Sequence, residues 1–128
     1  MLDTSAYSAL REGHEPVTAH VELASRVYVN AIVLGELRTG FLAGNRLQSN
    51  EEKLSDFLAM DGVEIAPMGE ETARRYALIR NHLKKTGRPI PTNDIWIAAT
   101  AFEYGLRLVT LDKHFERVEH VALDRFNW

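Results

Sequence analysis

The sequence contains no cysteine, and its histidines lack the spacings typical of paired zinc ligands. The absence of cysteine excludes disulfide bonds, cysteine-based zinc sites, iron–sulfur clusters and a cysteine nucleophile. The five histidines include neither an HExxH nor an HxH motif, so we do not expect a histidine-based zinc site.

Long apolar segments and an excess of basic charge are also missing. The longest run without charge or strong polarity, Ile95–Phe102, is far too short to span a bilayer. No charged and then apolar leader opens the chain, so we expect a cytoplasmic protein without membrane association. Fifteen lysines and arginines stand against 18 aspartates and glutamates, a net charge of −3. This argues against nucleic-acid binding over the whole surface and leaves room for a local basic patch.

The chain has the usual length of one domain, and neither repeats nor linkers interrupt it, so we expect a single domain over residues 1–128. Short apolar runs alternate with helical patterns, which predicts an α/β fold with a mostly parallel sheet. The predicted strands are Met1–Leu2, Arg26–Val29, Val63–Ala66, Leu108–Leu111 and an edge strand at Val118–Leu123. The predicted helices are Thr4–Glu12, Pro16–Ser25, Ala31–Leu42, Asn50–Met60 capped by Ser49, Glu70–Lys85 and Asp94–Tyr104, and Asp112–Phe115 forms a single turn.

Four acidic residues stand out from the polar helix faces that hold most of the others. Asp3 and Asp112 each end a predicted strand, and Asp94 opens the most apolar helix. Each of these three could simply cap a helix, since aspartate is among the best N-cap residues. Glu36 lies on the same helix stripe as Ile32 and Val33. A buried, unpaired carboxylate there would cost several kcal/mol, so we expect a cationic group to meet it.

Topology can bring these four acids together, because the carboxyl ends of parallel strands lie at one edge of a sheet. Four carboxylates in one cleft repel each other and would be partly protonated. A divalent cation removes this conflict, and ligation by oxygen alone selects Mg²⁺ or Mn²⁺. Such a site activates water for phosphodiester hydrolysis.

The order of the motifs closely resembles PIN-domain ribonucleases, and specifically the VapC-type toxins of bacterial and archaeal toxin–antitoxin pairs. The resemblance extends over essentially the whole chain. Each motif alone is weak, but four in the same order are fairly specific. They are Leu2-Asp3-Thr4-Ser5, Gly35-Glu36-Leu37-Arg38-Thr39-Gly40, Asn93-Asp94-Ile95-Trp96-Ile97-Ala98-Ala99 and Val109-Thr110-Leu111-Asp112.

The resemblance implies a three-layer α/β/α sandwich around a parallel sheet and an endoribonuclease dependent on Mg²⁺ or Mn²⁺, with tRNA or rRNA as the usual target. It also implies a VapB-type antitoxin as partner, a homodimer and a toxin–antitoxin hetero-oligomer. By position, Asp3, Glu36, Asp94 and Asp112 match the family's acidic metal site, and Ser5, Asn93 and Thr110 match its supporting residues. One departure is a short first strand, since only Met1 and Leu2 precede Asp3.

Several other residues have both a functional and a structural interpretation. Arg38 and Lys113 adjoin site segments and are candidate RNA contacts, although a solvated surface position is the simpler explanation for each. His114 could act as a general acid or base, but we favour a surface histidine. The second apolar stripe of the Ala31–Leu42 helix could pack on the Asn50–Met60 helix, bind the antitoxin, or do both; it consists of Leu34, Leu37, Phe41 and Leu42.

Two alternatives to a nuclease remain open at the level of sequence. A non-catalytic PIN-like module that binds RNA or protein is disfavoured by the complete acidic quartet. A phosphatase with an aspartyl nucleophile would usually carry a second aspartate two residues after Asp3, where this chain has Ser5.

Overall fold

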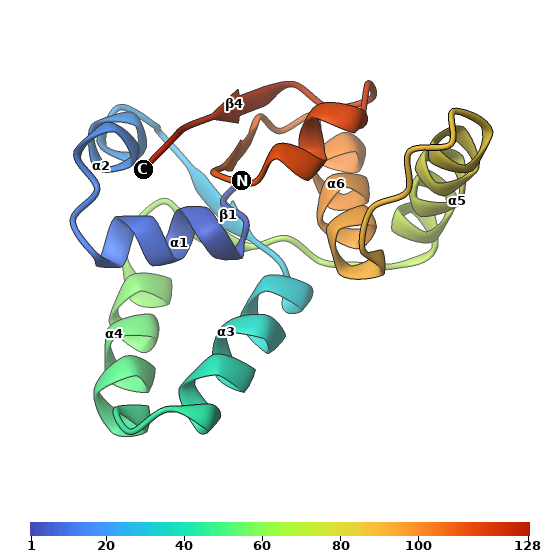
Figure 1. Cartoon of the computed structure of the whole chain (residues 1–128). Coiled ribbons are helices and arrows are strands. Elements are labelled where there is room, and N and C mark those ends of the chain that lie inside the picture. Colours follow the sequence, from blue (N-terminus) through green and yellow to red (C-terminus); the bar gives the residue numbers. More distant parts are fainter.

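The computed structural model describes residues 1–128 and has an α/β architecture in which six α-helices surround short parallel strands (Figure 1). This confirms the predicted fold class. The helices are α1 (Thr4–Arg11), α2 (Glu15–Glu22), α3 (Ala31–Ala43), α4 (Leu47–Ala59), α5 (Glu70–Lys85) and α6 (Thr92–Tyr104), with the 3₁₀-helix η1 at Lys113–Arg117. The strands are β1 (Val27–Val29), β2 (Val63–Ile65), β3 (Leu108–Thr110) and β4 (Leu123–Arg125).

The strands form two parallel pairs that the first residues of the chain join together. β1 pairs with β2, and β3 pairs with β4. Leu2 forms a parallel bridge with Val109 of β3, and its backbone N–H donates to the carbonyl of Tyr28 in β1 at 2.8 Å. The segment Met1–Asp3 therefore takes the place of a central strand, and Asp3 lies at its carboxyl end.

Polar caps at the ends of these strands start the following helices. Asp3 caps α1 by accepting a hydrogen bond from the backbone N–H of Ala6, and Asn30 caps α3 through the N–H of Val33. Asp112 caps η1 in the same way through the N–H of His114. Because side-chain oxygens satisfy these otherwise unpaired helix donors, each turn from strand to helix is held in one conformation.

A continuous apolar core of 21 buried residues stabilises this arrangement. Helix α6 contributes most to it, since Ile95, Ile97 and three alanines of that helix are buried. Figure 1 shows α5 beside α6 at one end of the molecule, while α3 and α4 form a separate helix pair. The rings of Tyr76 in α5 and Trp96 in α6 stack with centroids 4.1 Å apart. No helix is long and apolar enough to cross a membrane.

Several predicted boundaries were wrong; helix α2, for example, ends at Glu22 and not at Ser25. Helix α4 begins at Leu47, so Ser49 lies inside the helix and does not cap it. Helix α6 begins directly after Pro91, which places Asp94 in its first turn and not at its cap. The last strand is Leu123–Arg125, later than the predicted Val118–Leu123, because these residues are the ones that pair with β3. The turn predicted at Asp112–Phe115 is the start of η1.

Candidate functional site

Asp3 is the most buried acid in the molecule and is fully tied into hydrogen bonds. Only 4% of the residue is exposed. Its Oδ1 accepts hydrogen bonds from the Ser5 hydroxyl and the Ala6 N–H, both at 2.8 Å, while Oδ2 accepts from the Thr110 hydroxyl. Two sequence-predicted supporting residues, Ser5 and Thr110, thus both hold Asp3.

The same two hydroxyls connect Asp3 to the segment that carries Asp112. The Ser5 hydroxyl accepts the N–H of Leu111 at 3.0 Å, and the Thr110 hydroxyl accepts the N–H of Asp112 at 2.9 Å. Each hydroxyl therefore bonds a carboxylate oxygen on one side and a backbone N–H on the other. This bridge sets the position of Asp112 relative to Asp3.

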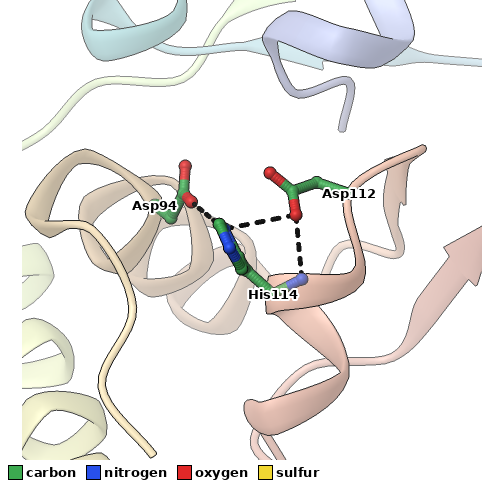
Figure 2. Close-up of side chains that lie close together, drawn as sticks. All are labelled: Asp94, Asp112 and His114. Atoms are coloured by element: carbon green, nitrogen blue, oxygen red, sulfur yellow. Dashed lines mark hydrogen bonds and ion pairs between the residues drawn. The ribbon is translucent and has the colours of Figure 1, made fainter.

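Asp94, Asp112 and His114 form a close group of side chains that can ligate a metal ion (Figure 2). His114 Nδ1 lies 3.4 Å from Asp94 Oδ2 and 3.2 Å from Asp112 Oδ1. One possible ligand atom from each residue lies within 4.8 Å of the others, the spacing of a group that could hold a metal ion. The sequence interpretation favoured a surface role for His114. Its position two residues after Asp112, in a turn that Asp112 caps, was the signal that could have placed it here.

Glu36 lies outside this group and differs from its prediction. It is half-buried rather than fully buried, and its partners are neutral. The Thr4 hydroxyl donates to its Oε1 at 2.6 Å, and the Asn93 side-chain amide donates to its Oε2 at 3.3 Å. No cationic side chain contacts Glu36, and the two neutral donors together with partial exposure solvate its carboxylate. Asn93, which directly precedes Asp94 in the chain, contacts Glu36.

The electrostatics of the site match the predicted crowding of carboxylates. The pKa of Asp94 is raised from 3.8 to about 6, chiefly by burial and also by the charges of Asp112 and Glu36, against the opposing effect of His114. Burial also raises the pKa of Asp3, against the opposing hydrogen bonds of Thr110, Ala6 and Ser5. A bound divalent cation would offset this repulsion, so the donor set fits a hard metal ion.

The predicted RNA contacts and the second apolar stripe occupy different environments. Arg38 pairs with Glu51 of α4 at 3.2 Å on the exposed side of α3, whereas Lys113 is exposed beside Asp112. Within the stripe, Leu34 and Leu37 are buried in the core, Phe41 is half-buried, and Leu42 is 70% exposed.

The surface has two hollows of similar size, and only one of them lies beside an acid of the candidate site. An open hollow of about 500 Å³ lies beside Glu36 and Asn93, next to the acids. A larger cavity of about 520 Å³ lies at the opposite, amino ends of β1 and β3, where Met1, Val27 and Leu106 line it. Since the acids gather at the carboxyl edge, the larger cavity is separate from the site.

Thr110→Val should destabilise the protein without changing the shape of its core. The substitution removes the hydroxyl that donates to buried Asp3 and accepts from the N–H of Asp112. Leaving buried polar groups unpaired costs roughly 1–3 kcal/mol, which thermal or urea unfolding would detect. Thr39→Val is the matched control, because that hydroxyl is exposed and bonds only the Gly35 carbonyl of its own helix. Equal stability changes in the two variants would contradict the assigned role of Thr110.

Comparison with known proteins identifies the family. The PIN domain family model matches residues 1–121. Ribonuclease VapC5 of Mycobacterium tuberculosis is 32% identical over 122 residues, which cover 95% of this chain and 89% of the relative. Ribonuclease VapC1 of Rickettsia felis is 33% identical over 124 residues, covering 93% of this chain and 90% of the relative. A solved structure of VapBC2 from Rickettsia felis, bound to a DNA fragment from their promoter, has a similar fold, with a TM-score of 0.88. The match has 27% sequence identity and covers 99% of this chain and 98% of that chain.

A parallel α/β fold with acids at the carboxyl edge of its strands, together with the family match, makes this chain a member of the PIN-domain family. Within that family it belongs to the VapC-type ribonuclease toxins of toxin–antitoxin systems. The resemblance carried by the four sequence motifs is thereby confirmed.

Proposed function

We propose that this chain is an endoribonuclease toxin that depends on Mg²⁺ or Mn²⁺ and hydrolyses phosphodiester bonds in tRNA or rRNA. The observation that carries the proposal is the crowding of Asp94 and Asp112, with the pKa of Asp94 raised to about 6, at the edge where Asp3 is also held. A bound divalent ion supplies an activated water and charge stabilisation for the leaving oxygen. Cytoplasmic RNA is the proposed substrate, so the chain would act in the cytoplasm.

The proposed roles follow from how each side chain is held. Asp3, Glu36, Asp94 and Asp112 bind the metal ion. Thr110 and Ser5 orient Asp3, and the Asn93 amide orients Glu36. Such outer hydrogen bonds fix ligand orientation, so the ligands need not reorganise when the ion binds.

RNA would approach over the exposed side of this edge. Lys113 is the better-placed phosphate contact, because it is exposed and directly follows Asp112. Arg38 pairs with Glu51, but an exposed ion pair is worth only about 0–1 kcal/mol, so a phosphate could replace Glu51. The alternative of a non-catalytic RNA- or protein-binding module is disfavoured, because clustered carboxylates repel phosphate unless a cation lies between them.

We further propose a VapB-type antitoxin as partner, in line with the toxin–antitoxin complex among the structural relatives. A groove of about 350 Å³ between α1, α3 and α4 is a suitable site. Tyr7, Leu37 and Phe41 form its apolar part, and its charged lining comprises Arg11, Arg46, Lys53 and Glu12. An antitoxin segment with apolar anchors and acidic neighbours would complement it, and Leu42, next to Phe41 in the chain, is exposed and available as a further contact. Leu34 would act only indirectly, from the core.

The assembly and the domain organisation are proposals of the same kind. The single apolar core draws residues from Met1 to Val118, which supports one domain over residues 1–128. Homodimerisation and a toxin–antitoxin hetero-oligomer are proposed from the family.

RNA cleavage by the purified chain, freed of antitoxin, tests the metal requirement. In excess EDTA, cleavage should fall at least about 100-fold, and added Mg²⁺ or Mn²⁺ should restore it, because the acids cannot position water by themselves. Ca²⁺ serves as a control for general charge screening. Undiminished cleavage in EDTA would refute metal dependence, and RNA binding without cleavage under every metal condition would favour the non-catalytic alternative.

A further inference from the structure

His114 points between two proposed metal ligands, yet the function proposed above gives it no role. Figure 2 shows its ring between the carboxylates of Asp94 and Asp112. Its Nδ1 is 3.4 Å from an oxygen of Asp94 and 3.2 Å from an oxygen of Asp112. The three side chains come from two elements, α6 and the start of η1, so tertiary packing brings them together.

The local fold holds His114 in this position. The backbone N–H of His114 donates to Asp112 Oδ1 at 2.9 Å, and the next residue, Phe115, is only 1% exposed and anchors η1 in the core. The His114 side chain is 41% exposed, which leaves an approach from solvent. The imidazole is therefore placed by a capped and anchored turn, unlike a free surface side chain.

The spacing of the donor atoms is close to that of ligands around one ion. Ligands at right angles with bonds of about 2.1 Å lie about 3 Å apart. The two measured separations, 3.2 and 3.4 Å, are only slightly longer. Asp94 and Asp112 each keep one carboxylate oxygen without a hydrogen bond to the protein, so oxygen donors remain available beside the nitrogen.

We propose that His114 supplies a nitrogen ligand to the ion held by Asp94 and Asp112 and thereby favours Mn²⁺ over Mg²⁺. This inference rests on the proposed metal-dependent function. Mg²⁺ is a hard ion that prefers oxygen ligands and bound water, whereas imidazole nitrogen suits transition metals better. A donor set of two carboxylates and one imidazole therefore differs from the all-oxygen set expected from the sequence.

Electron paramagnetic resonance of the Mn²⁺-loaded protein tests this without reference to catalysis. At fixed pH, the wild-type spectrum should show electron spin echo modulation from a directly bound ¹⁴N nucleus, and His114→Ala should abolish it. The variant should also bind Mn²⁺ at least about 10-fold more weakly, while Mg²⁺ binding, measured by competition, changes less than about 3-fold. His82→Ala is the matched control, because His82 lies on α5 and pairs with Glu119.

The possible outcomes separate this inference from the proposed function. Wild-type protein that binds Mn²⁺ without ¹⁴N modulation would overturn the ligand role of His114 and leave the carboxylate site intact. Tighter Mn²⁺ binding in His114→Ala would overturn it as well, because His114 would then compete with the ion. Wild-type protein that binds Mg²⁺ but no Mn²⁺ would overturn the ligand role of His114 alone, and wild-type protein that binds neither ion would overturn both proposals.

Discussion

Replacing Asp94 with asparagine should lower RNA cleavage about 1,000-fold and leave the fold intact. The substitution removes one negative ligand from the proposed metal site, a loss of several kcal/mol in transition-state stabilisation. About 4 kcal/mol corresponds to about 1,000-fold in rate. Asparagine keeps the size of the side chain, and no cap is lost because α6 begins at Thr92. Initial rates on a defined RNA with saturating Mg²⁺ or Mn²⁺ give the measurement.

The same substitution should stabilise the metal-free protein at neutral pH. Below pH 3.8 Asp94 is protonated in both the folded and the unfolded state, so its raised pKa costs nothing. Between pH 3.8 and about 6 the unfolded chain releases its proton first, so wild-type stability falls as pH rises. Above about pH 6 the full penalty applies, on the order of 3 kcal/mol. Asp94→Asn should therefore melt several degrees higher than wild type at pH 7.5 in EDTA, and this difference should vanish below about pH 4.

Asp56→Asn is the matched control for both effects, because Asp56 is an exposed acid on α4 far from the site in sequence. It should keep wild-type cleavage and show no stabilisation. If Asp94→Asn cleaves RNA at the wild-type rate, Asp94 is not a metal ligand. If it melts below wild type at pH 7.5 in EDTA, the proposed cost of the Asp94 charge in the metal-free protein is wrong.

A Phe41→Glu plus Leu42→Glu variant should bind the antitoxin at least about 100-fold more weakly than wild type. Phe41 lines the groove between α1, α3 and α4, and Leu42, the next residue of α3, is 70% exposed. A few apolar anchors usually dominate an interface, and burying an unpaired charge is costly. A loss of about 2.7 kcal/mol corresponds to about 100-fold in Kd. Leu37 is left unchanged, because at 5% exposure a glutamate there would disrupt the core.

Binding should be measured by calorimetry with the purified antitoxin, alongside a melting curve for each variant. The single variant Leu42→Glu controls for a folding defect in the double variant, because the Leu42 side chain is mostly exposed. Leu78→Glu on α5 is the control, because Leu78 is also exposed, at 54%, but lies away from the groove. If the folded double variant binds as tightly as wild type, the antitoxin uses another surface.

Local patterns predicted those elements that short-range interactions determine. Helix α5 spans Glu70–Lys85 as expected. Acidic residues lie in its first turn and basic residues in its last turn, and Arg74 and Arg75 pair with acids one turn earlier. Asp3, Asn30 and Asp112 follow strands and cap helices as local cap preferences indicate. Helix α4 begins before its expected start. Ser49 resembles an N-cap residue in the sequence, but the helix starts at Leu47 without a side-chain cap.

The sequence by itself determined the α/β class, the parallel strands and the order of the four acidic motifs, because alternation, caps and motif spacing are local properties. Only the tertiary structure decided what each acid contacts. Packing of α6 against η1 brought His114 to Asp94, Thr4 and Asn93 became the protein partners of Glu36, and Leu37 became core while Leu42 stayed exposed. His114 and Asp94 are 20 positions apart in the chain, and Thr110 and Asp3 are 107 positions apart. No local sequence pattern encodes contacts over such separations.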